Sequence, residues 1–347
     1  MINKDVNIIL SDKKSINDKL IRLIKNRCET ILEKFGQNVI TRVMDPKLLA
    51  ALEDVKKYWK DENRPSLTFF SCEAVGGSFE ISQDAALMFT LASSGFGIHD
   101  DILDQSKSKH LRMTILGLHG IDYALLVGDL LIVKAWAFAN QLIRKMGNPT
   151  KIADVLETYG DLSVEICEAE FMETQVRRKL DTTLDYYKNV LWKEMAEFEA
   201  CSRIGAMLGD GQPKEIEALA DFGRRVGLIS RLANEVEDCL NSKGDLLHRI
   251  EYESVPLPLL YAAKNSAKNY SEIEDILHRK RKNPTDDIKT LLSICFEAEA
   301  FDYMRKEGEK QKREADIKLK ELKDSEARDI LFTMVDVAYE NLNSLCI

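Results

Sequence analysis

Apolar residues recur along this chain at the three- and four-residue steps of an α-helix, and this periodicity restricts its fold more than any other feature. Between residues 16 and 35 the apolar side chains fall on one helical face, and Gly36 follows where such a helix should end. The strict alternation of apolar and polar residues that is typical of half-buried strands is missing. The sequence therefore predicts an all-α fold.

Further segments show the same amphipathic pattern. We predict helices over residues 45–59, 82–104, 121–146, 150–178, 183–208, 213–240 and 288–311. We predict loops over residues 63–66, 105–116, 147–150, 208–213 and 241–255. Because the 347 residues include 7 Pro and 17 Gly and no linker-like run, we expect one large helical domain over residues 1–347, with a loose N-terminus over residues 1–12.

Composition and charge exclude several classes of protein. The chain contains 45% hydrophobic residues but no apolar run of 18 residues, so we expect a sizeable core and no transmembrane helix. The formal net charge of -9 argues against binding to nucleic acid, which requires a basic face. The seven cysteines form no CxxC pair and residues 1–12 lack the features of a signal peptide, so we expect a cytoplasmic location.

Two clusters of polar residues carry the chemistry. Asp100, Asp101 and Asp104 end an apolar segment, and a helix would place Asp100 and Asp104 one turn apart on one face. Crowded carboxylates need a cation, and oxygen ligands at this spacing suit Mg²⁺, which is completed by water and substrate phosphate. Asn234 and Asp238 repeat the spacing. Two such clusters can lie opposite each other across a helical bundle.

The chain resembles the trans-isoprenyl diphosphate synthase, or polyprenyl synthetase, family over roughly residues 15–345. The matching segments occur in the family's order, at residues 63–65, 73–77, 99–104, 127–131, 192–194, 202–206, 234–238 and 254–257. The resemblance implies an isoprenoid synthase bundle with a central cavity, a homodimer and an allylic prenyl diphosphate as substrate.

Family roles carry over residue by residue. The resemblance implies ligation of Mg²⁺, with Mn²⁺ as an alternative, by Asp100, Asp101, Asp104, Asn234, Glu235 and Asp238. It also implies contacts to the substrate diphosphate from Arg64, Lys109, Lys193, Arg231 and Lys243. Among these residues, Lys193, Asp100 and Asp101 are the predicted catalytic set. Lys109 stands where the family has an arginine, so it keeps the charge but loses the bidentate fork.

The chain departs from the family where elongating synthases bind their second substrate, isopentenyl diphosphate. Arg64 is kept, but Asp61 stands in place of a lysine, Ser93 of a histidine and His110 of an arginine. A carboxylate replaces attraction of a diphosphate by repulsion, so we expect poor binding of isopentenyl diphosphate. The second cluster also departs, because it reads NExxD instead of DDxxD and is followed by a shorter loop.

Three functions compete at this stage. The main prediction is a class I enzyme that ionises an allylic prenyl diphosphate with Mg²⁺ and quenches the cation without isopentenyl diphosphate, as a terpene synthase does or by transfer to another acceptor. The first alternative is a chain-elongating E-polyprenyl diphosphate synthase of the geranyl, farnesyl or geranylgeranyl type. The second is a non-catalytic regulatory subunit of such a synthase. Gly95 and Phe96, just before the first cluster, are the candidates for setting chain length.

Overall fold

The computed structural model describes residues 2–59, 61–109, 112–146, 148–240, 245–278 and 284–346. Almost all of these residues are helical, which confirms the predicted all-α class. The first half of the chain forms α1 (Ile2–Asn38), η1 (Ile40–Arg42), α2 (Pro46–Tyr58), α3 (Asn63–Ala74), α4 (Phe79–Leu103), α5 (Ile115–His119), α6 (Ile121–Met146) and α7 (Pro149–Val176). Between α4 and α5, β1 (Ser108–Lys109) and β2 (Arg112–Met113) form a short antiparallel pair.

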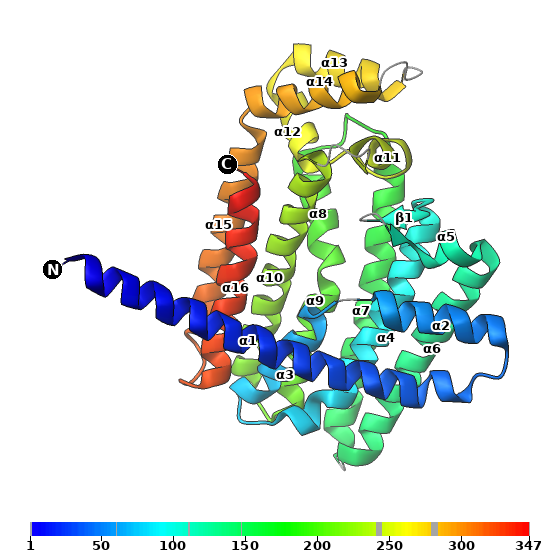
Figure 1. The fold of residues 1–347 in the computed structure, drawn as a ribbon, viewed down its shortest axis with the longest axis vertical. Coiled ribbons are helices and arrows are strands. Elements are labelled where there is room, and N and C mark those ends of the chain that lie inside the picture. Colours follow the sequence, from blue (N-terminus) through cyan, green and yellow to red (C-terminus); the bar gives the residue numbers. More distant parts are fainter. Residues whose placement is uncertain are drawn as a thin grey trace.

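The second half of the chain continues the bundle (Figure 1). It forms α8 (Leu184–Glu194), α9 (Ala196–Leu208), α10 (Pro213–Leu240), α11 (Asp245–Tyr252), α12 (Leu257–Asn265), α13 (Ala267–His278), α14 (Pro284–Glu297), α15 (Ala300–Leu319) and α16 (Glu326–Leu345). None of the helices in the described ranges is long and apolar enough to cross a membrane.

Four predicted segments differ from the structure. The predicted helix 288–311 is divided between α14, which ends at Glu297, and α15, which begins at Ala300, because Glu299 between them adopts a left-handed backbone conformation. The predicted loop 63–66 is the first turn of α3, because the Asp61 carboxylate accepts hydrogen bonds from the backbone N–H groups of Asn63 and Arg64 at 2.9 and 3.4 Å. The predicted helix 183–208 is interrupted at Met195, whose N–H bonds back to Trp192 in a tightened last turn. The predicted loop 241–255 contains α11.

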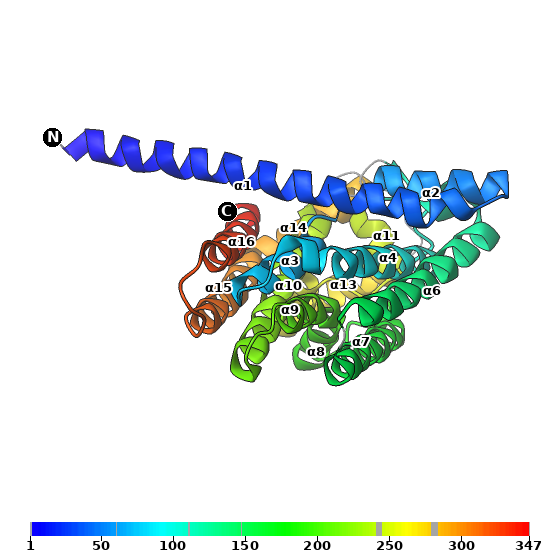
Figure 2. The same cartoon turned by 90° about the horizontal axis from the view of Figure 1, so that it is seen from below.

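Close backbone contacts hold the central helices together (Figures 1 and 2). α4 packs against α3 and α6, α9 packs against α3 and α10, and α10 packs against α15 and α16. A Cβ atom at Gly205 of α9 would collide with the backbone carbonyl of Thr68 in α3, so these two helices approach each other as closely as glycine allows. In Figure 2, α1 and α2 lie along one face, where α1 contacts α4 and α2 contacts α6.

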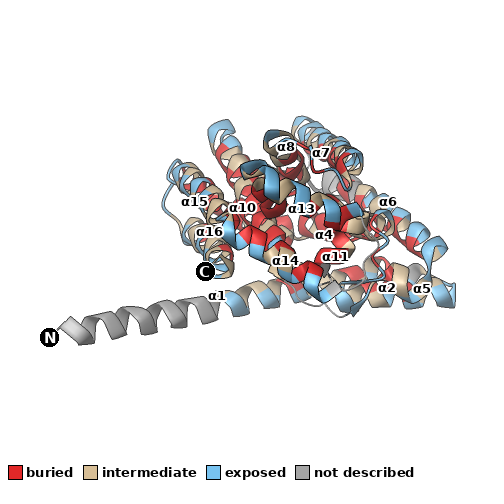
Figure 3. Cartoon of the chain, turned by 90° about the horizontal axis from the view of Figure 1, so that it is seen from above, coloured by how far each residue is buried: buried red, intermediate tan, exposed pale blue. Residues whose placement is uncertain are grey.

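α4 leads to the first acidic cluster and is largely buried along its middle (Figure 3). Its residues 85–95 are all buried, and its hydroxyl side chains stay satisfied by bonding within the helix. Ser93 donates to the Thr90 carbonyl at 3.3 Å, and Ser94 donates to the same carbonyl at 2.8 Å. A rigid, buried helix therefore fixes the position of the aspartates at its end.

Some predictions concern parts of the chain that the structure does not test. In the N-terminal helix, side chains are described only from Leu20, so the loose N-terminus predicted over residues 1–12 stays a prediction, as does the single domain. Lys243 and His110 lie outside the described residues. All seven cysteines are free and five of them are buried. The cytoplasmic location remains a prediction.

Candidate active site

A cavity of about 810 Å³ lies between the C-terminal ends of α4 and α10, with α7, the α8–α9 bend and α11 as its other walls. Nine carboxylic acids line it: Asp100, Asp104, Glu170, Glu173, Glu194, Glu197, Glu237, Asp238 and Glu253. Five lysine and arginine side chains line it: Arg64, Lys107, Lys109, Arg231 and Arg249. Acids therefore outnumber fixed cations. Such a cavity attracts additional positive charge before it can accept an anionic diphosphate.

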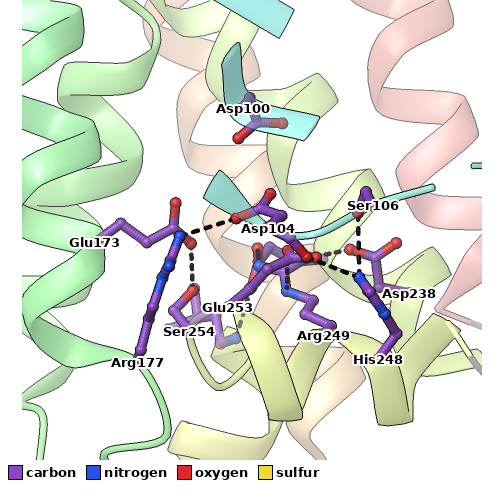
Figure 4. Close-up of polar contacts among 12 residues, drawn as sticks. Asp100, Asp104, Ser106, Glu173, Arg177, Asp238, His248, Arg249, Glu253 and Ser254 are labelled. Carbon is purple, nitrogen blue, oxygen red and sulfur yellow. Dashed lines mark hydrogen bonds and ion pairs between the residues drawn. The ribbon is translucent and has the colours of Figure 1, made fainter. Parts of the chain in front are cut away.

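The first cluster reaches the cavity through Asp100 and Asp104, while Asp101 is not among the lining residues. The Lys109 ammonium lies 2.9 Å from the carboxylates of both Asp100 and Asp101. Asp104 is paired with Arg177, the residue after α7, at 3.1 Å (Figure 4). The sequence spacing thus placed two of the three predicted aspartates on the cavity face, with Asp101 turned to the lysine.

Crowding changes the ionisation of these acids. Burial raises the pKa of Asp104 to about 10, and the neighbouring Asp100 carboxylate adds to the effect. Burial also opposes ionisation of Asp100, but the charge and hydrogen bond of Lys109 outweigh it and hold the pKa of Asp100 below its ordinary value. Burial and the charge of Asp100 raise the pKa of Glu170 to about 9. The positive charge near the first cluster is therefore too small to keep all of its carboxyl groups ionised.

The second cluster divides between the cavity and the core. Asn234 and Asp238 line the cavity, one turn apart on α10. Glu235, predicted as a metal ligand, is instead fully buried and forms an ion pair with Arg231 at 2.9 Å. Its carboxylate also accepts the backbone N–H of Leu257 at 2.7 Å. Within the described residues, the histidine, cysteine and acidic side chains form no group of three or more placed to hold a metal ion.

Only some of the residues predicted to contact the substrate diphosphate line the cavity. Lys193 pairs with Glu168 of α7 at 2.8 Å and is not among the residues that line the cavity. Arg231 lines the cavity but is held by Glu194 at 2.7 Å and by Glu235. Arg64, Lys109 and Arg231 are therefore the predicted contacts that reach this space among those described.

Arg64 is held between two carboxylates. Asp61 contacts it at 2.9 Å and Glu197 at 2.5 Å, while its guanidinium stacks over Phe198, 4.7 Å from the ring centroid. Burial raises the pKa of Glu197 to about 7, although the charge of Arg64 opposes the shift. Glu197 thus carries a proton for part of the time near neutral pH.

Several lining residues were missed from the sequence. Ile166, Glu170 and Glu173 lie on one face of α7 at steps of three and four residues, a spacing that could have indicated a shared wall. Arg249 and His248 come from α11, where a loop was predicted. His248 lies 3.0 Å from the backbone carbonyl of Asp104 and 3.2 Å from the Ser106 hydroxyl, so α11 links both clusters (Figure 4).

The two residues predicted to set chain length, Gly95 and Phe96, lie in different surroundings. A Cβ atom at Gly95 would lie 2.9 Å from the Gly128 carbonyl and 2.7 Å from Ile132, so Gly95 permits close packing of α4 on α6. Phe96 lines the cavity. Of the two residues, Phe96 is the one that lines the cavity, and its role in setting chain length stays a prediction.

Comparison with solved structures defines the class. The geranylgeranyl pyrophosphate synthetase from Pyrococcus horikoshii superimposes with a TM-score of 0.82 at 24% identity, over 93% of this chain and 99% of that one. The fold is therefore that of the isoprenoid synthases. The chain belongs to the polyprenyl synthetase family, because the family description "Polyprenyl synthetase" matches residues 48–295.

Curated relatives cover a smaller part of the chain. A short chain isoprenyl diphosphate synthase from Methanothermobacter thermautotrophicus is 29% identical over 224 residues, which is 62% of this chain and 68% of that protein. A geranylgeranyl diphosphate synthase from Methanosarcina mazei is 29% identical over 178 residues, which is 50% of this chain and 53% of that protein. The match thus spans between about half and two thirds of these relatives.

The relatives contradict the main functional prediction. They are named as isoprenyl, geranylgeranyl and geranylfarnesyl diphosphate synthases, which supports the chain-elongating alternative over ionisation without isopentenyl diphosphate. The prediction relied on repulsion of a diphosphate by Asp61. In the structure that carboxylate pairs with Arg64 and bonds to the first turn of α3, so much of its charge is already neutralised.

Proposed function

We propose that this chain extends an allylic prenyl diphosphate by addition of isopentenyl diphosphate, with Mg²⁺ or Mn²⁺ as cofactor. The observation that carries the proposal is that α4 and α10 present Asp100, Asp104 and Asp238 to one acid-rich cavity in a member of the polyprenyl synthetase family. The acidic excess of this cavity matches a substrate that arrives together with divalent cations.

The residues of the first cluster fit a divalent ion. Asp100 and Asp104 offer carboxylate oxygens to the cavity, and the raised pKa of Asp104 indicates insufficient compensating charge. When bound, the ion stabilises the negative charge that develops on the departing diphosphate. Lys109 and Arg177 now pair with these two aspartates, and Lys109, which lines the cavity, can donate to the diphosphate once a metal replaces it.

Isopentenyl diphosphate would bind near Arg64, next to Trp59 and Ser93 in the cavity wall. Asp61 and Glu197 reduce the charge that Arg64 offers to the headgroup, so we expect a high Michaelis constant for this substrate. Partial protonation of Glu197 near neutral pH lowers the opposing charge.

An elongation assay tests the proposal. The purified protein is incubated with Mg²⁺ and geranyl, farnesyl or geranylgeranyl diphosphate, with and without isopentenyl diphosphate, and the products are separated by length. We expect longer prenyl diphosphates when both substrates and Mg²⁺ are present. Arg64→Gln should reduce extension by about tenfold or more because it removes a charge-assisted contact. Arg203→Gln, which removes another ion-paired arginine outside the lining of this cavity, should not.

Other outcomes of this assay separate the remaining functions. Release of diphosphate from the allylic substrate without extension would contradict the proposal. An absence of turnover with every substrate would instead favour a regulatory subunit.

We also propose a homodimer formed through α6 and α7. These neighbouring helices carry exposed apolar residues spaced two turns apart, namely Leu126 and Val133 on α6 and Val164 and Phe171 on α7, each more than 60% exposed. Light scattering at micromolar concentration should give about twice the chain mass of 39.5 kDa. Phe171→Glu should shift the protein toward monomer, whereas Phe296→Glu on α14 should not. A monomeric unaltered protein would contradict this proposal.

A further inference from the structure

Arg249 occupies the centre of the second acidic cluster. Its side chain is 3% exposed, and its guanidinium donates to the carboxylate of Asp238 (Figure 4), to that of Glu235 and to the Tyr187 hydroxyl. The Glu253 carboxylate forms a longer ion pair with Arg249, 3.8 Å from Nε. A positive charge is therefore already built into the place where the second cluster would hold a metal.

The surroundings of Arg249 hold it there. Its partner Glu235 is 0% exposed and is fixed by Arg231, by the Leu257 N–H and by the Tyr187 hydroxyl at 3.3 Å. Tyr187 is bound in turn to Ser254 at 2.8 Å. Withdrawal of Arg249 would take a buried charged donor away from the buried Glu235 carboxylate, which is costly, so the guanidinium stays in the cluster when substrate arrives.

The cations of the first cluster are held less firmly. The Lys109 side chain is 41% exposed and that of Arg177 is 28% exposed, and each contacts a carboxylate that faces the cavity, Asp100 and Asp104 respectively. An incoming divalent ion can displace such cations into solvent. The two clusters therefore differ in whether their present cation can be exchanged.

We propose that Arg249 is the permanent cation of the second acidic cluster, and that divalent ions bind only to the first. This inference rests on the proposed function. The donor set supports it, because Glu235 is turned into the core and Asp238 is bonded to the guanidinium. A divalent ion placed beside that guanidinium would meet like-charge repulsion. Arg249 thus acts as a positioning residue that fixes one side of the diphosphate site without metal.

Anomalous scattering can locate the ions directly. Crystals of the unaltered protein are soaked with MnCl₂ and inorganic pyrophosphate, and Mn²⁺ peaks are assigned to their ligands. We expect peaks beside Asp100 and Asp104 and none on Asp238. A Mn²⁺ peak coordinated by Asp238 in the unaltered protein would overturn the inference.

Variants supply the complementary evidence through Mn²⁺ binding in solution. Asp238→Asn should leave the number of bound ions unchanged, whereas Asp100→Asn should weaken Mn²⁺ binding by about tenfold or more. In crystals soaked in the same way, the Arg249→Gln variant should show a new Mn²⁺ peak beside Asp238. If the Arg249→Gln variant does not fold, the Asp238→Asn variant still tests the inference. If Asp238→Asn binds one Mn²⁺ fewer than the unaltered protein, the inference is refuted.

The outcomes also separate this inference from the proposed function. Two occupied clusters in an elongating protein would refute the role of Arg249 alone. Absence of Mn²⁺ from both clusters would overturn both conclusions.

Discussion

Asp100→Asn should slow the release of diphosphate from an allylic substrate by roughly 100-fold or more at saturating Mg²⁺. The carboxylate of Asp100 lines the cavity one turn from Asp104, and its low pKa keeps it charged and available as a metal ligand. An amide in its place keeps the shape but loses the charge that holds the ion. Single-turnover measurement of pyrophosphate release reports this step separately from product dissociation.

Asp101→Asn is the matched control for this prediction. Asp101 is the next residue on α4, contacts the same lysine and undergoes the same chemical change, but it is absent from the cavity lining. We expect a much smaller effect, transmitted through the position of Lys109. Equal losses in the two variants would show that both aspartates ligate the metal, as the resemblance to the family implied. Near-normal release from Asp100→Asn would refute the metal assignment.

The helical class was predictable because periodicity records which side of each segment is buried. Helix ends were harder, since they depend on particular hydrogen bonds. The sequence around Pro65 indicated a loop, but the Asp61 carboxylate caps this segment and makes it the start of α3. The break at Met195 was not visible because both sides of it are amphipathic.

The candidate site was predictable to the extent that it depends on spacing along one helix. The i, i+4 rule placed Asp100 with Asp104 and Asn234 with Asp238 on the cavity. The rule cannot tell which way an adjacent residue turns, because the rotation of α10 against its neighbours decides that. Glu235 therefore was assigned to a metal although it lies in the core. Arg249 reaches the cluster from a separate helix, so no local pattern could reveal it.

Glu235→Ala should lower the free energy of unfolding by about 3–5 kcal/mol, because it removes one partner from a buried ion network. The change would leave the guanidinium groups of Arg249 and Arg231 without their shared carboxylate and would open a void beside Tyr187. Urea unfolding followed by circular dichroism, at one fixed protein concentration and without metal or substrate, measures the difference.

Glu237→Ala provides the comparison, because Glu237 lies two residues along α10 but is exposed. Its removal should change the unfolding free energy by no more than about 0.5 kcal/mol. Glu235→Gln should fall between the two, since an amide retains one acceptor for Arg249 but no charge. If Glu235→Ala instead cost less than about 1 kcal/mol, the carboxylate would not anchor Arg249. The guanidinium would then be free to leave the second cluster, and that cluster could bind a metal ion.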